Sequence, residues 1–362
     1  MSVQTLRVAD DPLELCRQST REGWGDGLPL VPPTEERVNE ALRFTDRDPD
    51  EVLGNVPPSR GEATVRHVAV NAVMAGCLPA YFRVVLAAVD AMIRQQDRFN
   101  LYGMQATTNP VGIAGFVNGP VIEQLDFNAG WNSLGQGNQA NATVGRAIRL
   151  CALNLGGARP GQMDRATHGF PGKYSFFFAE NEPASPWDPF HVEHGHEPGA
   201  STVTLFGAAG NLNMLEFTDD GHELARVMAA SIRFPTNNDY LCNGEPWLVV
   251  SPEHADTLRD AGYDKANLRQ FLWEHARIPI AEFTRRTLDY IVRAMWEPVL
   301  GELTEETSIP PAEKPEHIRI VVSGGPSVHS QYVPTFGDTR HLVVPIVNND
   351  GEPILDFTVP AR

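Results

Sequence analysis

The sequence predicts an α/β protein, with a mixed or mostly parallel sheet flanked by helices and an irregular N-terminal arm. Short runs of β-branched and aromatic residues, typical of buried strands, alternate with segments whose apolar residues have helical spacing. A β–α step is clearest where the apolar run Trp247–Val250 precedes a segment that begins at Pro252. Apolar residues make up 42% of the chain, which is enough for a large core.

A chain of 362 residues predicts one large or two modest domains. We divide it into an arm at 1–62, a main α/β body at 63–302 that contains the site, and a C-terminal α/β segment at 303–362 that completes the sheet. Glycines break the arm between Gly23 and Pro29, and a segment rich in Pro and Glu at 303–316 is typical of a linker.

The elements follow from spacing and from residues that begin or end helices. Helices are predicted from Thr34 onward and at 64–76, 79–93, 141–154, 221–232, 252–261, 265–276 and 280–295. Strands are predicted at 101–108, 111–118, 174–178, 201–206, 247–250, 318–322 and 341–347.

Composition excludes several classes of function. The formal net charge is -17 and no run of Lys or Arg occurs, which argues against a nucleic-acid partner. The N-terminus has no signal-peptide pattern, and no apolar stretch approaches the roughly 18 residues that would span a membrane. We therefore expect a cytoplasmic protein, and in that reducing compartment the four scattered cysteines, which form no CxxC pair, should be free thiols.

The segment Asp164–Glu197 has the densest chemistry, with reactive side chains at both ends of a predicted strand. We expect His168, Lys173 and Glu180 to converge with Asn141 on one cavity, as a general base, an anion or carbonyl clamp and a carboxylate that tunes the base. The alternative is that Glu180 caps a neighbouring backbone and His168 only packs.

A loop of Gly and Asn residues at 127–138 precedes a predicted helix. Such a loop suits an anion or carboxylate ligand, or it is a tight turn with a helix cap. Asn181 and Ser327 lie near the ends of predicted strands, where α/β sheets collect ligands. The predicted substrate-binding residues are Asn132, Gly135, Gly137, Asn138, Asn141, Asn181 and Ser327.

Cys77 lies between two predicted helices, just before Pro79. A position at a helix N-terminus would favour a thiolate, so Cys77 is a candidate catalytic residue. The alternative is a small buried apolar side chain.

Four possible metal ligands cluster near the end of the segment: His191, Glu193, His194 and His196. Pro189 and Pro198 bracket them, which is typical of an exposed loop, and the spacing matches no HExxH helix. We predict no metal here, and these four residues are the candidates if one binds. The sequence identifies no cofactor.

Four segments carry a resemblance: Glu22–Val38, Asn71–Val89, Ala140–Gly161 and Asp164–Glu182. They resemble a poorly characterised bacterial family whose members are associated with small UGSC-motif selenoproteins or their cysteine counterparts. The resemblance implies redox or nucleophilic thiol chemistry in a small thiol or selenol partner. This chain has no GSC motif, so that reactive group would come from the partner.

Three functions follow as hypotheses. The first is an enzyme or enzyme subunit of lyase or reductase type, which acts on a small acidic or thiol- or nitrogen-containing metabolite. The second is a non-catalytic partner subunit of a small redox protein, and the third is a metal-dependent hydrolase that uses His191–His196. We also expect a homo-oligomer, because an isolated arm could not bury Trp24, Leu28, Leu30 and Val31.

Overall fold

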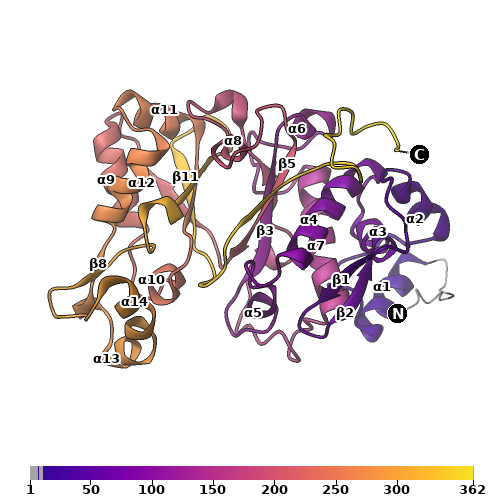
Figure 1. Ribbon diagram of the computed structural model, residues 1–362, viewed down its shortest axis with the longest axis horizontal. Helices are drawn as coiled ribbons and strands as arrows, with labels where there is room; N and C mark the ends of the chain where they lie inside the picture. The colour runs from indigo at the N-terminus through magenta and orange to yellow at the C-terminus, as the bar shows by residue number, and fades with distance from the viewer. Residues whose placement is uncertain (1–6, 8–10, 362) are drawn as a thin grey trace.

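The computed structural model describes residue 7 and residues 11–361. Two four-stranded mixed sheets face each other, and helices cover the outer face of each sheet, so the body has four layers. In Figure 1 the layers run from α9 and α12 on one side, through the two sheets, to α4 and α7 on the other. The predicted α/β class with a mixed sheet is therefore confirmed.

The first sheet has the strand order β12-β5-β3-β4, in which β3 and β4 run parallel and the other neighbours antiparallel. Helices α4 and α7 pack on its outer face, and α3 packs on both of them. The bounds are β3 Gly112–Asn118, β4 Phe177–Ala179, β5 Thr202–Ala208, β12 Leu342–Pro345, α3 Val65–Ala75, α4 Phe82–Arg94 and α7 Gln139–Gly156.

The second sheet has the order β10-β7-β11-β6, in which β10 and β7 run parallel. Three helices share an apolar core with its outer face. The bounds are β6 Leu212–Leu215, β7 Trp247–Val250, β10 Arg319–Val322, β11 His329–Val333, α9 Gly221–Ser231, α11 Pro252–Asp260 and α12 Lys265–His275.

Shorter elements connect these layers. They are α1 Pro12–Glu22, α2 Glu35–Leu42, β1 Val52–Val56, β2 Gly61–Thr64, α5 Leu101–Gln105, α6 Val121–Gln124, α8 Phe190–Glu193, α10 Asn238–Cys242, β8 Ile278–Pro279, α13 Arg285–Thr287, α14 Arg293–Leu300 and β9 Ser308–Ile309. Residues 303–362 supply β10 and β11 to the second sheet and β12 to the first, so this segment completes both sheets.

Aromatic side chains fill the space between the sheets. Side chains alternate along a strand, so Phe116 of β3 points into this layer while Val117 points to the helices. The rings of Phe206 and Trp247, one from each sheet, stack with centroids 4.3 Å apart. Full burial of each such side chain contributes about 1.5–3 kcal/mol or more, which holds the sheets together.

Some predicted elements are wrong. Residues 101–108 were expected as a strand but begin with α5, because Asn100 adopts a left-handed conformation and its side chain caps the helix at Gly103. The predicted strand at 174–178 starts only at Phe177, since the 3₁₀ turn at Pro171–Lys173 leaves Tyr174 with helical backbone angles. Six strands of the described chain were not predicted: β1, β2, β6, β8, β9 and β11.

The N-terminal arm packs on the chain's own body. Leu30 is buried and Trp24 contacts the core of the first sheet's helices. Asp26 accepts two hydrogen bonds from Arg146, at 2.7 and 2.8 Å, which attach the arm to α7. Leu28 and Val31 remain partly exposed. The arm therefore buries part of its apolar surface without a neighbour, and the homo-oligomer stays a prediction.

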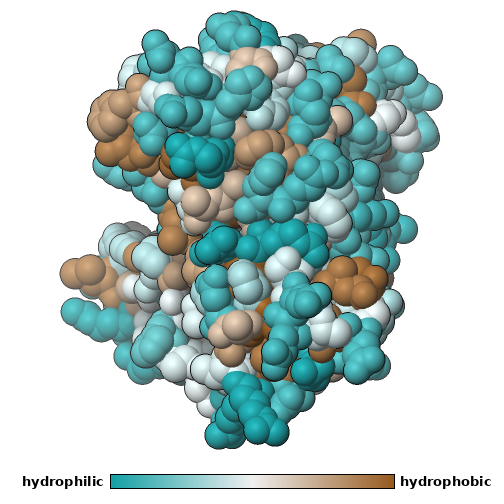
Figure 2. Space-filling view, turned by 90° about the vertical axis from the view of Figure 1, so that its left-hand side faces the viewer, coloured by the Kyte–Doolittle hydropathy of each residue, from teal (hydrophilic) through white to brown (hydrophobic). Residues whose placement is uncertain are grey.

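Figure 2 shows the side of the molecule that carries the second sheet's helices. Hydrophilic residues dominate this surface, and apolar residues gather in a hollow between its upper and lower parts. In the described part of the chain, no helix is both long enough and apolar enough to cross a membrane.

Candidate active site

Polar side chains replace the aromatic ones at one end of the inter-sheet layer. Asn118 lies two residues after Phe116 and therefore on the same face of β3. Glu180 lies two residues after Phe178, just beyond the end of β4, and faces the same layer. Thr202, at the start of β5, is the register partner of Asn118. Because β3 and β4 are parallel, their carboxyl ends meet at this edge, the usual place for a ligand in such sheets.

Glu180 is fully buried at this edge. Its Oε2 accepts hydrogen bonds from Asn118 Nδ2 at 2.5 Å and from the Phe190 backbone N–H at 2.8 Å. Its Oε1 lies 3.8 Å from Lys265 Nζ and has no hydrogen bond among the described residues. Burial raises the pKa of Glu180 to about 7, although Lys265 and Asn118 oppose the rise.

Lys265 is the cation nearest to Glu180, and it is 3% exposed at the start of α12. Its Nζ donates to the Asp188 carbonyl at 2.7 Å and lies 3.5 Å from Glu193. Arg269, one turn further along α12, pairs with the same Glu193 carboxylate at 2.9 Å. Two cations from one helix therefore face the short helix α8 and the end of β4.

His191 is also fully buried, on α8. Its Nε2 lies 3.4 Å from the Pro198 carbonyl, so Nε2 donates and Nδ1 is left as an acceptor. Nδ1 has no hydrogen bond within the described chain and lies 3.8 Å from Glu182 Oε1. Glu182 Oε1 in turn accepts from Asn118 Nδ2 at 2.8 Å. Burial lowers the pKa of His191, which keeps the ring neutral.

A second buried network begins at the other end of α8. His194 donates from Nδ1 to the Phe190 carbonyl at 2.7 Å, and His341 donates from Nδ1 to Glu245 at 2.8 Å. The two Nε2 atoms are 3.1 Å apart. Because each neutral ring carries its proton on Nδ1, a hydrogen bond between the Nε2 atoms needs one additional proton. Burial lowers the pKa of His341, although Glu245, which also binds Arg319 at 2.7 Å, opposes the change. Burial also lowers the pKa of His194 to about 4, so this ring takes up a proton only in acid.

The predicted Gly/Asn loop and the loop after β10 meet beside Glu180. Ser323 donates to the Ala179 carbonyl at 2.8 Å and lies 2.9 Å from Ser133 Oγ. Gly324 is held between the Ala129 carbonyl, which accepts from its N–H at 2.8 Å, and Asn181, which donates to its carbonyl at 3.1 Å. The expectation that these loops fold together at strand ends agrees with this geometry.

The polar side chains of the predicted substrate-binding set mainly shape these loops. Asn138 caps α7 by accepting from the Asn141 N–H, and Asn141 donates to the Asn128 and Ser133 carbonyls. Asn132 donates to the Gln136 carbonyl at 2.7 Å. Two further members of this set have notable backbone features. The Ser327 carbonyl accepts a hydrogen bond from Ser251 Oγ, and Gly137 has a positive φ of 116°.

The structure does not bring the predicted catalytic residues together. Lys173 follows Gly172, which lies against Gly112 at one end of β3, whereas Glu180 binds Asn118 at the other end. Six residues of strand separate these ends, or about 20 Å. Lys173 pairs with Asp164 at 2.5 Å, and His168 is exposed. The prediction was wrong because it placed residues from opposite ends of one strand in the same cavity. Asn141 binds the Asn128 and Ser133 carbonyls instead of these residues.

Cys77 needs a similar correction. Its backbone N–H donates to the Ala72 carbonyl, so the residue belongs to the C-terminal cap of α3 that Gly76 forms. The 3₁₀ turn that follows begins only at Pro79. Although Cys77 is half-buried as a residue, the packing around its sulfur raises the pKa of the thiol to about 12. These surroundings oppose the thiolate that a catalytic role would need.

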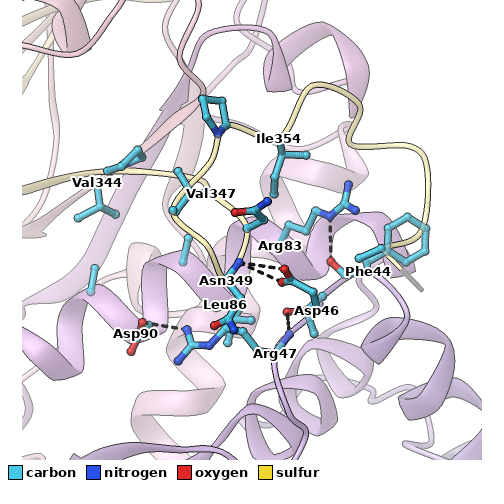
Figure 3. Close-up of a pocket in the computed structure, with 18 of the residues that line it drawn as sticks. Phe44, Asp46, Arg47, Arg83, Leu86, Asp90, Val344, Val347, Asn349 and Ile354 are labelled. Atoms are coloured by element: carbon cyan, nitrogen blue, oxygen red, sulfur yellow. Dashed lines mark hydrogen bonds and ion pairs between the residues drawn. The ribbon is translucent and has the colours of Figure 1, made fainter.

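A cavity lies elsewhere in the molecule, away from Glu180. It measures about 620 Å³ and opens between α4, the arm and the C-terminal segment, on the helix side of the first sheet (Figure 3). Its charged groups are paired: Arg47 with Glu51 and Asp90, at 2.5 and 2.9 Å. Arg83 donates to backbone carbonyls of both neighbouring segments. The cavity has room for a ligand, but the reactive groups face the opposite side of the sheet.

The predicted metal candidates do not form one set of ligands. His191 faces Glu182, Glu193 binds Arg269, and His194 meets His341. Across residue 7 and residues 11–361, no three His, Cys, Asp or Glu side chains are arranged to hold a metal ion.

Comparisons with family models, with curated proteins and with solved structures find no match. The resemblance to the UGSC-associated family therefore stays a prediction, and the function is argued from the site.

Sequence reasoning missed Asn118, Lys265, Glu245 and His341. The rule that selected Glu180, a polar residue at the end of a buried strand, would also have selected Asn118. Lys265 had no such signal, because it follows the helix-capping Asp264 as many surface lysines do. His341 precedes β12 and joins the second network through its contacts with His194 and with Glu245, which precedes β7.

Proposed function

We propose that this chain is a cytoplasmic enzyme of lyase type, in which Glu180 moves a proton to or from a small metabolite. The observation that carries the proposal is the Glu180 carboxyl, fully buried at the carboxyl ends of β3 and β4 with a pKa of about 7. A general base works best when its pKa is near the working pH. Its Oε1 has no hydrogen bond within the described residues, so that oxygen is available to a substrate.

The neighbouring groups suit an elimination. In this scheme the Glu180 carboxylate takes a proton from a carbon of the substrate, and the electron pair of that C–H bond becomes the new double bond. The leaving group departs from the adjacent carbon with its bonding pair and accepts a proton from the Lys265 ammonium. Lys265 Nζ, 3.8 Å from Glu180 Oε1, is close enough for both groups to serve one substrate. Glu180 is then the base in place of His168, and Lys265 is the cation of the site in place of Lys173.

Loss of turnover without loss of fold tests the proposal. A mixture of small metabolites is incubated with the wild-type protein, with Glu180→Gln and with Glu305→Gln, and compounds consumed or formed are followed by mass spectrometry. Glu305 is exposed, so its variant is a matched control. We expect wild type and Glu305→Gln to convert the same compound, and Glu180→Gln to do so at least 100-fold more slowly. Equal rates in all three proteins would rule out Glu180 as the base.

A further inference from the structure

We propose that the buried polar cluster around Glu180, at the carboxyl ends of β3 and β4, binds a small amine or ammonium group. The inference deepens the proposed function, because it names the chemical class that the same site accepts. It starts from four atoms that lack a hydrogen bond in the described chain and belong to fully buried residues: Asn118 Oδ1, Glu180 Oε1, His191 Nδ1 and Thr202 Oγ1.

Three of these four atoms are hydrogen-bond acceptors. Asn118 donates both of its Nδ2 bonds, to Glu180 and Glu182, so its free Oδ1 can only accept. Glu180 Oε1 accepts when the carboxyl is ionised, and His191 Nδ1 accepts because Nε2 holds the proton. The Thr202 hydroxyl can do either. A ligand that satisfies this set must bring several N–H or O–H donors.

The local charge favours a cation among such donors. Three carboxylates gather here, Glu180, Glu182 and Glu193, against the two cations Lys265 and Arg269. With Glu180 ionised and His191 neutral, the cluster therefore carries one excess negative charge in a buried place. A primary ammonium supplies three donors and one positive charge, which balances both the hydrogen bonds and the charge.

The connections among these residues place them around one location. The Asn118 amide touches both Glu180 and Glu182, and His191 Nδ1 lies 3.8 Å from Glu182. Thr202 is opposite Asn118 in the β3–β5 register, where neighbouring side chains have Cβ atoms about 4.5–5.5 Å apart. Because every one of these residues is fully or largely buried, the first probe should be little larger than water.

Methylammonium chloride is that probe, with tetramethylammonium chloride as a cation of the same charge without N–H donors and sodium acetate as an anion. Each is titrated at pH 8 and constant ionic strength into protein with ¹³C-labelled histidine, and the His191 ring signal is followed by NMR. We expect methylammonium to shift this signal with a Kd at least tenfold lower than that of tetramethylammonium. Glu180→Gln should raise the methylammonium Kd at least tenfold, and Glu305→Gln should leave it unchanged.

A second variant keeps the inference testable if Glu180→Gln does not fold. Thr202→Val removes one unpartnered hydroxyl and should raise the Kd about fivefold, the fold-change of one hydrogen bond of about 1 kcal/mol. Acetate binding better than methylammonium, equal Kd values for the two cations, or no shift with methylammonium would overturn the inference. If turnover depends on Glu180 but methylammonium does not bind, the amine inference is wrong and the proposed function stands. If methylammonium binds but no compound is turned over, the proposed function is wrong and the amine inference stands.

Discussion

Replacing Glu180 by glutamine should change how the free energy of unfolding depends on pH. Burial raises the pKa of Glu180 from its ordinary 4.5 to about 7 in the folded chain. Between these pH values the folded chain keeps a proton that the unfolded chain has released. The stabilisation from the neutral carboxyl is therefore complete below about pH 4.5 and is lost as the pH rises through 7. At about 1.4 kcal/mol per pH unit, the loss amounts to about 3 kcal/mol.

Glutamine has nearly the same shape and cannot ionise, so the variant should not show this loss. Urea unfolding at several pH values from 4.5 to 8 measures the free energy of both proteins, with the slope against urea checked for constancy. We expect the variant to gain about 3 kcal/mol relative to wild type between pH 4.5 and pH 8. Asp239, whose pKa burial also raises to about 7, is present in both proteins, so its effect cancels in the comparison.

The exposed control Glu305→Gln should follow the wild-type curve at every pH. If the curve of Glu180→Gln also runs parallel to that of wild type, Glu180 titrates near its ordinary pKa. Its proposed role as a base near neutral pH would then lose its physical support.

Three further predictions concern other parts of the chain. Cys77 should react with iodoacetamide at neutral pH roughly a thousandfold more slowly than in urea-unfolded protein, because its thiol pKa of about 12 lies well above the ordinary 9.0; equal rates would mean an accessible thiolate. Arg83→Ala should destabilise the fold by about 2 kcal/mol and speed proteolysis of the C-terminal segment, since Arg83 donates to the Asp356 and Val359 carbonyls at 2.8 Å; an unchanged cleavage rate would contradict this. Glu245→Gln should cost about 3 kcal/mol in urea unfolding, because Arg319 would keep a buried charge without its carboxylate; a cost under about 1 kcal/mol would show that the charge is solvated.

Patterns local in sequence account for much of the fold. The body helices and most of the sheet strands were predictable from apolar spacing, caps and glycines, because these signals act over a few residues. Short or exposed strands such as β6 escaped, since Leu212 and Leu215 face solvent and carry no buried pattern. The stretch at 101–108 was mistaken because a single side-chain cap, from Asn100, outweighed the apolar run.

The sequence by itself determined that most of the sheet strands are buried and that a carboxylate follows β4, because runs of apolar residues and strand ends are properties of consecutive residues. Only the tertiary structure decided what Glu180 meets. Lys173 is near in sequence but lies at the far end of the same strand, whereas Lys265 is distant in sequence and reaches Glu180 because α12 packs beside α8. His341 is likewise distant in sequence from His194 and from Glu245, and it contacts both of them in the folded chain. Contacts of this kind depend on how layers pack, and no spacing within one segment encodes them.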